Sequence, residues 1–152
     1  MLALSPNSAS ALAAIGRCKI FVGPIEEAIP AEEQAIRLSP RDPSIAIWYF
    51  RIGEAYLLQS RIQDAILWFE RARSANGALP GVHGFLSAAY GLKGENERAT
   101  AELAEARKLG GKGFWPSIAR LRAVTRYEAP AIRAYCEATF YAGLRKAGVP
   151  EE

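Results

Sequence analysis

The segment IGEAYLLQSRIQDAILWFERA (52–72) recurs 34 residues later as LSAAYGLKGENERATAELAEA (86–106). The matched positions share a small residue, a tyrosine, an alanine, a large apolar residue and a second alanine. The pairs are Gly53 with Ser87, Tyr56 with Tyr90, Ala65 with Ala99, Phe69 with Leu103, and Ala72 with Ala106. Small residues allow two antiparallel helices to approach closely, and large residues three or four positions apart fill the space between them. The repeat therefore predicts stacked helical hairpins and an all-α fold.

These residues resemble the tetratricopeptide repeat pattern. A weaker copy lies upstream, with Gly16 at the small position and with Ala28 and Ala35 seven residues apart. In this copy Lys19 stands where the pattern has a tyrosine. The resemblance implies an α-α superhelix of about three helical hairpins in residues 1–113, followed by C-terminal capping helices. The expected units span residues 9–42, 46–79 and 80–113.

The repeat stops after the glycine-rich segment at 110–113. For residues 114–152 we therefore expect two helices that cap the stack. The first is expected from Ser117 to Val124, and the second begins near Pro130, a residue suited to a first helical turn. The apolar face expected for the second helix consists of Ile132, Tyr135, Cys136, Thr139, Phe140 and Leu144. Such helices cover the last apolar face of an open solenoid.

A more specific resemblance is carried by three motifs in order: AIRLSPRDP (35–43), WFERA (68–72) and GLRKAGVPEE (143–152). Together they resemble the C-terminal region of proteobacterial adenylate/guanylate cyclases, in which a catalytic domain is followed by a tetratricopeptide region. The resemblance implies a regulatory or scaffolding segment of a signalling protein. A separated fragment of a nucleotide cyclase is an alternative. Because no cyclase catalytic motif is present, the resemblance implies no cofactor.

The first helices of such units line a concave groove. The residues expected to face it, and so to form a partner-binding surface, are Ala13, Arg17, Ile20, Phe21, Ile47, Phe50, Glu54, Leu57, Leu58, Gly84, Ala88, Gly91 and Leu92. An exposed apolar patch at Phe50, Leu57 and Leu58 would bind other apolar surfaces, so we expect another segment or molecule to cover it. Three occupants remain open: the chain's own C-terminal helix, a protein or peptide ligand, or a second copy of the chain. The lysine and asparagine pair with which chaperone-binding members hold a terminal carboxylate is absent.

The net charge of +3 is unevenly distributed. Residues 1–106 hold ten Lys or Arg against twelve Asp or Glu, which sums to −2, and residues 107–152 hold nine against four, which sums to +5. A basic end attracts acidic partners, anionic surfaces or nucleic acid. The alternative function, anion or nucleic-acid binding, would use Arg120, Arg122, Arg126 and Arg133. A solvated surface is the simpler interpretation, and nucleic acid is the less favoured partner.

The sequence does not predict an enzyme. The single histidine, His83, falls at a position that packs inside the repeat, and one histidine with the distant Cys18 and Cys136 cannot supply a zinc ligand set. No catalytic, cofactor-binding or metal residue is therefore expected. The carboxylates of Glu32 and its neighbour Glu33 are expected to be explained by the helix dipole and by solvent.

The longest apolar run, at residues 45–50, is far shorter than the roughly 20 residues that a membrane-spanning helix needs. The N-terminal sequence MLALSPNSAS has no basic residue near Met1 and is interrupted by Pro6, so it lacks the features of a secretory signal. We therefore expect a cytoplasmic protein without a membrane partner.

Overall fold

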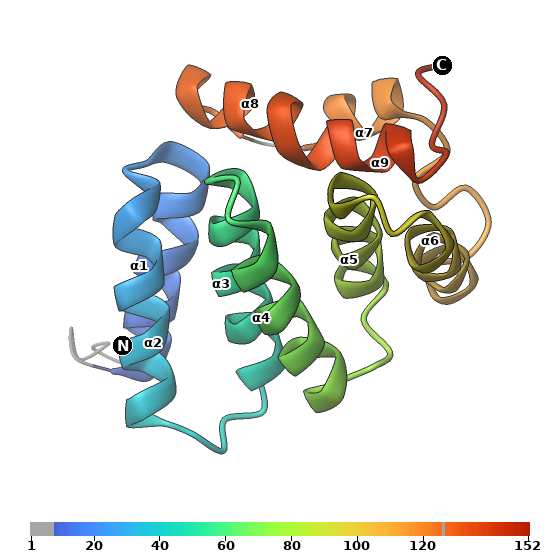
Figure 1. The fold of residues 1–152 in the computed structure, drawn as a ribbon. Coiled ribbons are helices and arrows are strands. Elements are labelled where there is room, and N and C mark those ends of the chain that lie inside the picture. Colours follow the sequence, from blue (N-terminus) through green and yellow to red (C-terminus); the bar gives the residue numbers. More distant parts are fainter. Residues whose placement is uncertain (1–7, 126) are drawn as a thin grey trace.

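Three helical hairpins stack side by side in the computed structural model, which describes residues 8–125 and 127–152 (Figure 1). The hairpins pair α1 (Ala9–Val22) with α2 (Ala28–Leu38), α3 (Ile45–Leu58) with α4 (Ile62–Ala75), and α5 (Pro80–Lys93) with α6 (Asn96–Gly110). A short 3-10 turn, η1 (Ile25–Glu27), leads into α2. Between the hairpins, α2 contacts α3 and α4 contacts α5. The predicted succession of hairpins is confirmed, and no strand occurs among the described residues.

Two turns, 34 residues apart, adopt the same backbone conformation. Gly94 ends α5 with φ 86°, and its N–H donates to the carbonyl oxygen of Gly91. Ser60 follows α3 with φ 62°. Left-handed backbone of this kind ends a helix and reverses the chain, and glycine adopts it without the steric cost that a Cβ brings. The repeat period is thus present in the turns as well as in the helices.

Small residues bring the two helices of each hairpin together. A Cβ atom placed on Gly53 would lie 2.6 Å from the ring of Phe69, so only glycine leaves room for this phenylalanine. Ser87, at the matching position of the third hairpin, is buried, and its Oγ donates to the carbonyl oxygen of Ala99 at 2.7 Å. The aromatic and aliphatic side chains opposite these positions form one continuous core.

Glu32 is the charged residue buried inside the first hairpin. It is 0% exposed, and a Cβ placed on Gly16 would lie 2.7 Å from its Cγ atom. Its Oε1 atom lies 3.4 Å from Nη1 of Arg51, while Oε2 has no hydrogen-bond partner among the described residues. Burial raises the pKa of Glu32 to about 7, although Arg51 acts in the opposite direction. The expectation that solvent explains this carboxyl group is therefore wrong, because the small residue on α1 makes space for it inside the fold.

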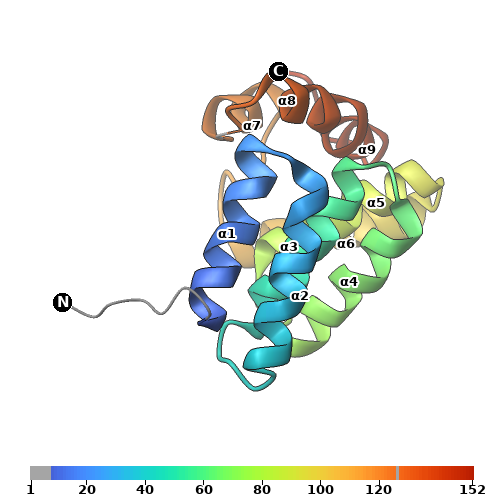
Figure 2. The same ribbon diagram turned by 90° about the vertical axis from the view of Figure 1, so that its left-hand side faces the viewer.

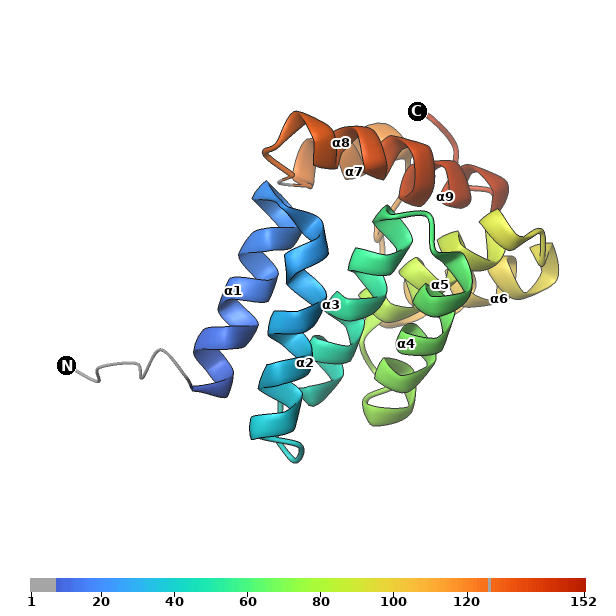
Figure 3. The ribbon, with the colours of Figure 1, turned by 60° about the vertical axis from the view of Figure 1, so that its left-hand side comes forward.

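The C-terminal segment crosses one end of all three hairpins. It comprises α7 (Ile118–Val124) and a continuous helix built from α8 (Pro130–Cys136), a π-helical turn η2 (Glu137–Tyr141) and α9 (Ala142–Lys146). We call residues 130–146 the tail helix. Its α8 part contacts α1 and α3, and its α9 part contacts α5. Figure 3 shows it lying across the ends of the hairpins, and Figure 2 shows α7 at the same end of the molecule.

The buried face of the tail helix differs from the expected one at two tyrosines. Tyr135 is 43% exposed, so its expected place on the apolar face is wrong, whereas Tyr141 is buried. The π-helical turn between them contains one residue more per turn than an α-helix, and this turns the following residues relative to the preceding ones. The other expected residues of this face are buried, namely Ile132, Cys136, Thr139, Phe140 and Leu144. In the described part of the chain, none of the helices combines the length and apolar character needed to cross a bilayer.

Candidate partner-binding groove

The tail helix closes one end of the predicted groove. A Cβ atom on Gly143 of α9 would lie 2.7 Å from the carbonyl carbon of Ala88 and 2.9 Å from its Cα atom. A Cβ atom on Gly91 would in turn lie 3.3 Å from the carbonyl carbon of Gly143. The backbones of α5 and α9 therefore touch, and nothing fits between them. The predicted groove residues that are buried in the folded chain, whether by the tail helix or by other elements, are Ala13, Ile20, Glu54, Leu57, Leu58, Gly84, Ala88 and Gly91.

Tyr127 anchors the segment before the tail helix to α1 and α3. Its hydroxyl group donates a hydrogen bond to the carboxylate of Glu54 inside the fold. Its ring stacks on Phe21 of α1, with 5.4 Å between the ring centroids. The carbonyl oxygen of Phe21 also accepts hydrogen bonds from the N–H groups of Glu128 and Ala129, at 3.3 and 3.4 Å. Burial raises the pKa of Glu54 to about 7, and the hydrogen bond from Tyr127 only partly opposes this shift.

The other part of the groove stays open. Arg17 is exposed, and Ile47 and Phe50 are half-buried. A cavity of about 380 Å³ lies between α1 and α3; its lining residues are Ser10, Ala13, Ala14, Arg17, Ser44, Ile47, Trp48 and Arg51. We call it the α1–α3 cavity. Of the remaining predicted groove residues, Phe21 and Leu92 are half-buried.

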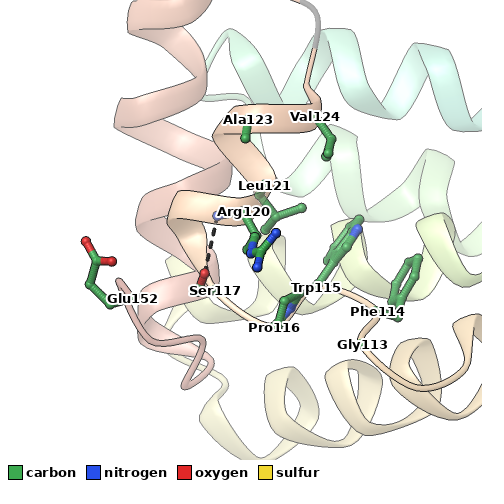
Figure 4. A pocket seen from close by; sticks show the side chains of 10 residues that line it. All are labelled: Gly113, Phe114, Trp115, Pro116, Ser117, Arg120, Leu121, Ala123, Val124 and Glu152. Carbon is green, nitrogen blue, oxygen red and sulfur yellow. Dashed lines mark hydrogen bonds between the residues drawn. The ribbon is translucent and has the colours of Figure 1, made fainter.

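Residues after the third hairpin line a second, larger cavity that the sequence did not predict. It has a volume of about 760 Å³, and its lining residues are Gly113, Phe114, Trp115, Pro116, Ser117, Arg120, Leu121, Ala123, Val124 and Glu152 (Figure 4). We call it the α7 cavity. The rings of Phe114 and Trp115 stack at 4.9 Å, and Val124 is 71% exposed. The wall of the α7 cavity is mainly aromatic and aliphatic, and the guanidinium group of Arg120 lies beside it (Figure 4).

Trp115 connects this cavity to the first helices of the hairpins. A Cβ atom on Gly84 would lie 2.7 Å from Cε3 of Trp115, so the indole ring packs directly on the backbone of α5. The Trp115 ring also contacts Phe85, at 6.0 Å between centroids, and Phe85 contacts Phe50 at 5.0 Å. Aromatic side chains thus run without a break from the open part of the groove to the α7 cavity. The sequence feature that could have indicated the α7 cavity is the aromatic pair Phe114-Trp115, which directly follows a glycine-rich connection.

The arginines of the alternative basic surface have different surroundings. Nε of Arg122 lies 2.5 Å from Glu137, and Nη1 lies 2.6 Å from Glu151. Arg122 and Arg133 line a small pocket of about 130 Å³, whereas Arg120 lines the α7 cavity. The fourth member of the predicted surface, Arg126, lies outside the described residues.

Of the remaining reactive side chains, His83 and Cys136 are buried and Cys18 is exposed. His83 is buried, with Nδ1 2.6 Å from Glu102 and Nε2 2.9 Å from the carbonyl oxygen of Gly77. Cys18 and Cys136 are both free thiols. Burial raises the pKa of Cys136 to about 12. Over residues 8–125 and 127–152, no group of three or more His, Cys, Asp or Glu residues is arranged to hold a metal ion.

Comparison with known proteins supports the fold directly. The structure described as "Crystal structure of MamA" matches with a TM-score of 0.64 and 23% sequence identity, over 93% of this chain and 80% of that chain. No known family model matches the sequence, and no curated protein matches it. At this level of identity the similarity establishes architecture alone. The chain therefore folds as an all-α, tetratricopeptide-like superhelix of helical hairpins that ends in capping helices.

Proposed function

We propose that this chain is a non-catalytic protein-interaction module that binds an apolar segment of a partner protein in the open part of its groove. The observation that carries the proposal is the apolar surface that the tail helix leaves uncovered. Ile47 and Phe50 are half-buried on one side of this surface, and Phe114 and Trp115 are half-buried on the other. Val124, beside them, is 71% exposed. Aromatic side chains in a concave site are the usual anchors of protein recognition.

The size of the open surface favours an extended peptide or a single helix over a folded domain. The α7 cavity, at about 760 Å³, accepts only a few side chains. The tail helix closes one end of the groove, because Gly143 touches the backbone of α5. A partner that leaves the tail helix in place is therefore confined to the surface between α1, α3 and α7. A partner segment of this kind docks through a few apolar anchors along its length.

Val124 provides the test, because its exposure allows a charged substitution without unfolding. Peptides would be selected from a random phage-displayed library on the immobilised full chain, and their Kd measured by fluorescence anisotropy. Val124→Asp should raise Kd by about tenfold or more, because it puts a charge against the apolar anchors of the ligand. The matched control is Leu38→Asp on α2, where the leucine is 54% exposed and lines neither cavity. Equal effects of the two substitutions, with unchanged circular dichroism, would refute this site.

We infer further that the module acts in the cytoplasm and serves a signalling protein, as the resemblance to cyclase C-terminal regions implies. The support is the order of the three motifs at 35–43, 68–72 and 143–152. The test is the coding sequence next to this one, which should encode a cyclase catalytic domain or a DNA-binding domain. A neighbourhood without either would count against the signalling role and leave the interaction role intact.

The alternative basic surface is not favoured. The charge of Arg122 faces the carboxylates of Glu137 and Glu151, so it is already largely neutralised. The described arginines also line two different cavities.

A further inference from the structure

Two guanidinium groups line the α1–α3 cavity, and none of the described residues that line it is acidic. Arg17 projects from α1, is exposed, and makes no ion pair with any described residue. Arg51 projects from α3 into the same cavity. The other lining residues are alanines, serines, Ile47 and Trp48, so the cavity combines positive charge with an apolar floor.

Arg51 retains hydrogen-bonding capacity for a ligand. Its Nη1 atom lies 3.4 Å from Oε1 of Glu32 and 3.3 Å from the carbonyl oxygen of Ala13, and both contacts are long. Its Nε and Nη2 atoms make no hydrogen bond with the described residues. A guanidinium group has five N–H donors, and the side chain of Arg51 is 17% exposed, so part of this group reaches the cavity. Burial raises the pKa of Glu32 to about 7, so this carboxyl group neutralises Arg51 only in part at neutral pH.

Backbone dipoles add to the positive potential of the cavity. Ser10 lies in the first turn of α1 and Ser44 precedes the first turn of α3, and both line the cavity. The N-terminal turns of two 14-residue helices therefore border the cavity, although the carboxylate of Asp42 already accepts a hydrogen bond from the N–H of Ser44 at the start of α3. The hydroxyl group of Ser44 makes no hydrogen bond with the described residues.

We propose that the α1–α3 cavity binds a carboxylate side chain of the partner segment, held between Arg17 and Arg51. The inference rests on the proposed function and adds the chemistry of the partner, a segment that combines Asp or Glu with apolar residues. The apolar residues of the partner contact the half-buried side chains of Phe50 and Trp115, between which Phe85 is buried against Phe140 of the tail helix, and the carboxylate of the partner lies on the α1 side of Phe50. Two arginines on one carboxylate give charge-assisted hydrogen bonds with defined geometry, and so provide specificity that the apolar surface lacks.

The test uses charge reversal at Arg17, which is exposed and unpaired among the described residues and is therefore replaceable without unfolding. The probes are peptides selected on the full chain as above, each synthesised with its acidic residue kept, changed to the amide, or changed to lysine. We expect selected peptides to contain Asp or Glu. Both the amide peptide and the variant Arg17→Glu should weaken binding about tenfold. Arg17→Glu should recover affinity with the lysine peptide, whereas Arg37→Glu, an exposed arginine of α2 outside the cavity, should change nothing.

The outcomes separate this inference from the proposed function. If Val124→Asp abolishes binding while Arg17→Glu and the amide peptide do not, the groove binds an apolar segment and the carboxylate site is overturned. If no peptide is recovered from the library, both proposals are overturned. If Arg17→Glu instead dissolves a dimer seen in analytical ultracentrifugation, the occupant is a second copy, and the carboxylate site for a partner segment is overturned.

Discussion

Gly143→Ala tests the contact that closes one end of the groove. The added methyl group would lie 2.7 Å from the carbonyl carbon of Ala88 and 2.9 Å from its Cα atom, whereas ordinary van der Waals contact begins near 3.4 Å. Because the obstructing atoms are backbone, no side-chain rotation relieves the clash, and α9 must move away from α5 by roughly 1 Å. Overpacking of this kind costs about 2 kcal/mol. For a chain of this length, the loss lowers Tm by about 4–8 °C.

The assay is urea unfolding followed by circular dichroism, with the two parameters of the linear fit reported separately. We expect a lower midpoint and an unchanged slope for Gly143→Ala, because the unfolded states of variant and parent expose similar surface. Gly81→Ala is the matched control, since its added Cβ would meet no described heavy atom within 4 Å apart from its chain neighbours and the nearby backbone of its own helix. This control should be neutral or gain up to about 1 kcal/mol from helix propensity. Equal stability of the two variants would refute the close crossing of α5 and α9.

Two further predictions concern buried residues of α3. Leu57→Asp places a charge where the leucine is fully buried, so it should cost about 4 kcal/mol or more and remove the cooperative unfolding transition; a folded variant would contradict the burial of Leu57. Glu54→Gln tests a pH effect. Between its ordinary value of 4.5 and the folded pKa of about 7, the folded chain keeps a proton on Glu54 that the unfolded chain releases, so stability falls as pH rises through this range. The variant should therefore be more stable than the parent by about 3 kcal/mol near pH 8 and lose this part of the pH dependence in urea titrations, because the amide oxygen still accepts from Tyr127. Identical pH profiles would contradict the assignment.

The hairpins were predictable because their signals are local and periodic. Gly53 and Phe69 pack against each other within one unit, and the matching pair is Ser87 and Leu103. The turns at Ser60 and Gly94 follow the same spacing. A period of 34 residues therefore contains most of the information about these helices.

The candidate site was less predictable because it depends on contacts outside the repeat. Nothing in the sequence near Gly84 indicates that the ring of Trp115 packs on it, since the two residues belong to different elements. The hydrogen bond from Tyr127 to Glu54 joins two elements in the same way. Glu32 looked like a surface carboxylate because its immediate neighbour is also acidic, whereas its burial depends on Gly16 of another helix. The periodicity of apolar residues shows which face of a helix is buried. Which element packs against that face depends on the tertiary structure and cannot be read from the periodicity.

The tail segment also determines how the chain folds and unfolds as a whole. In an open array, each unit contacts only its neighbours, and the ends fray independently of the middle. Here Phe21 of the first unit accepts hydrogen bonds from Ala129, more than a hundred residues away along the chain, and α9 rests on the third unit. Such distant contacts raise the contact order and slow folding, since a long loop must close before they form. We therefore expect the first and third units to unfold in one cooperative transition, so that damage at either end weakens the whole molecule.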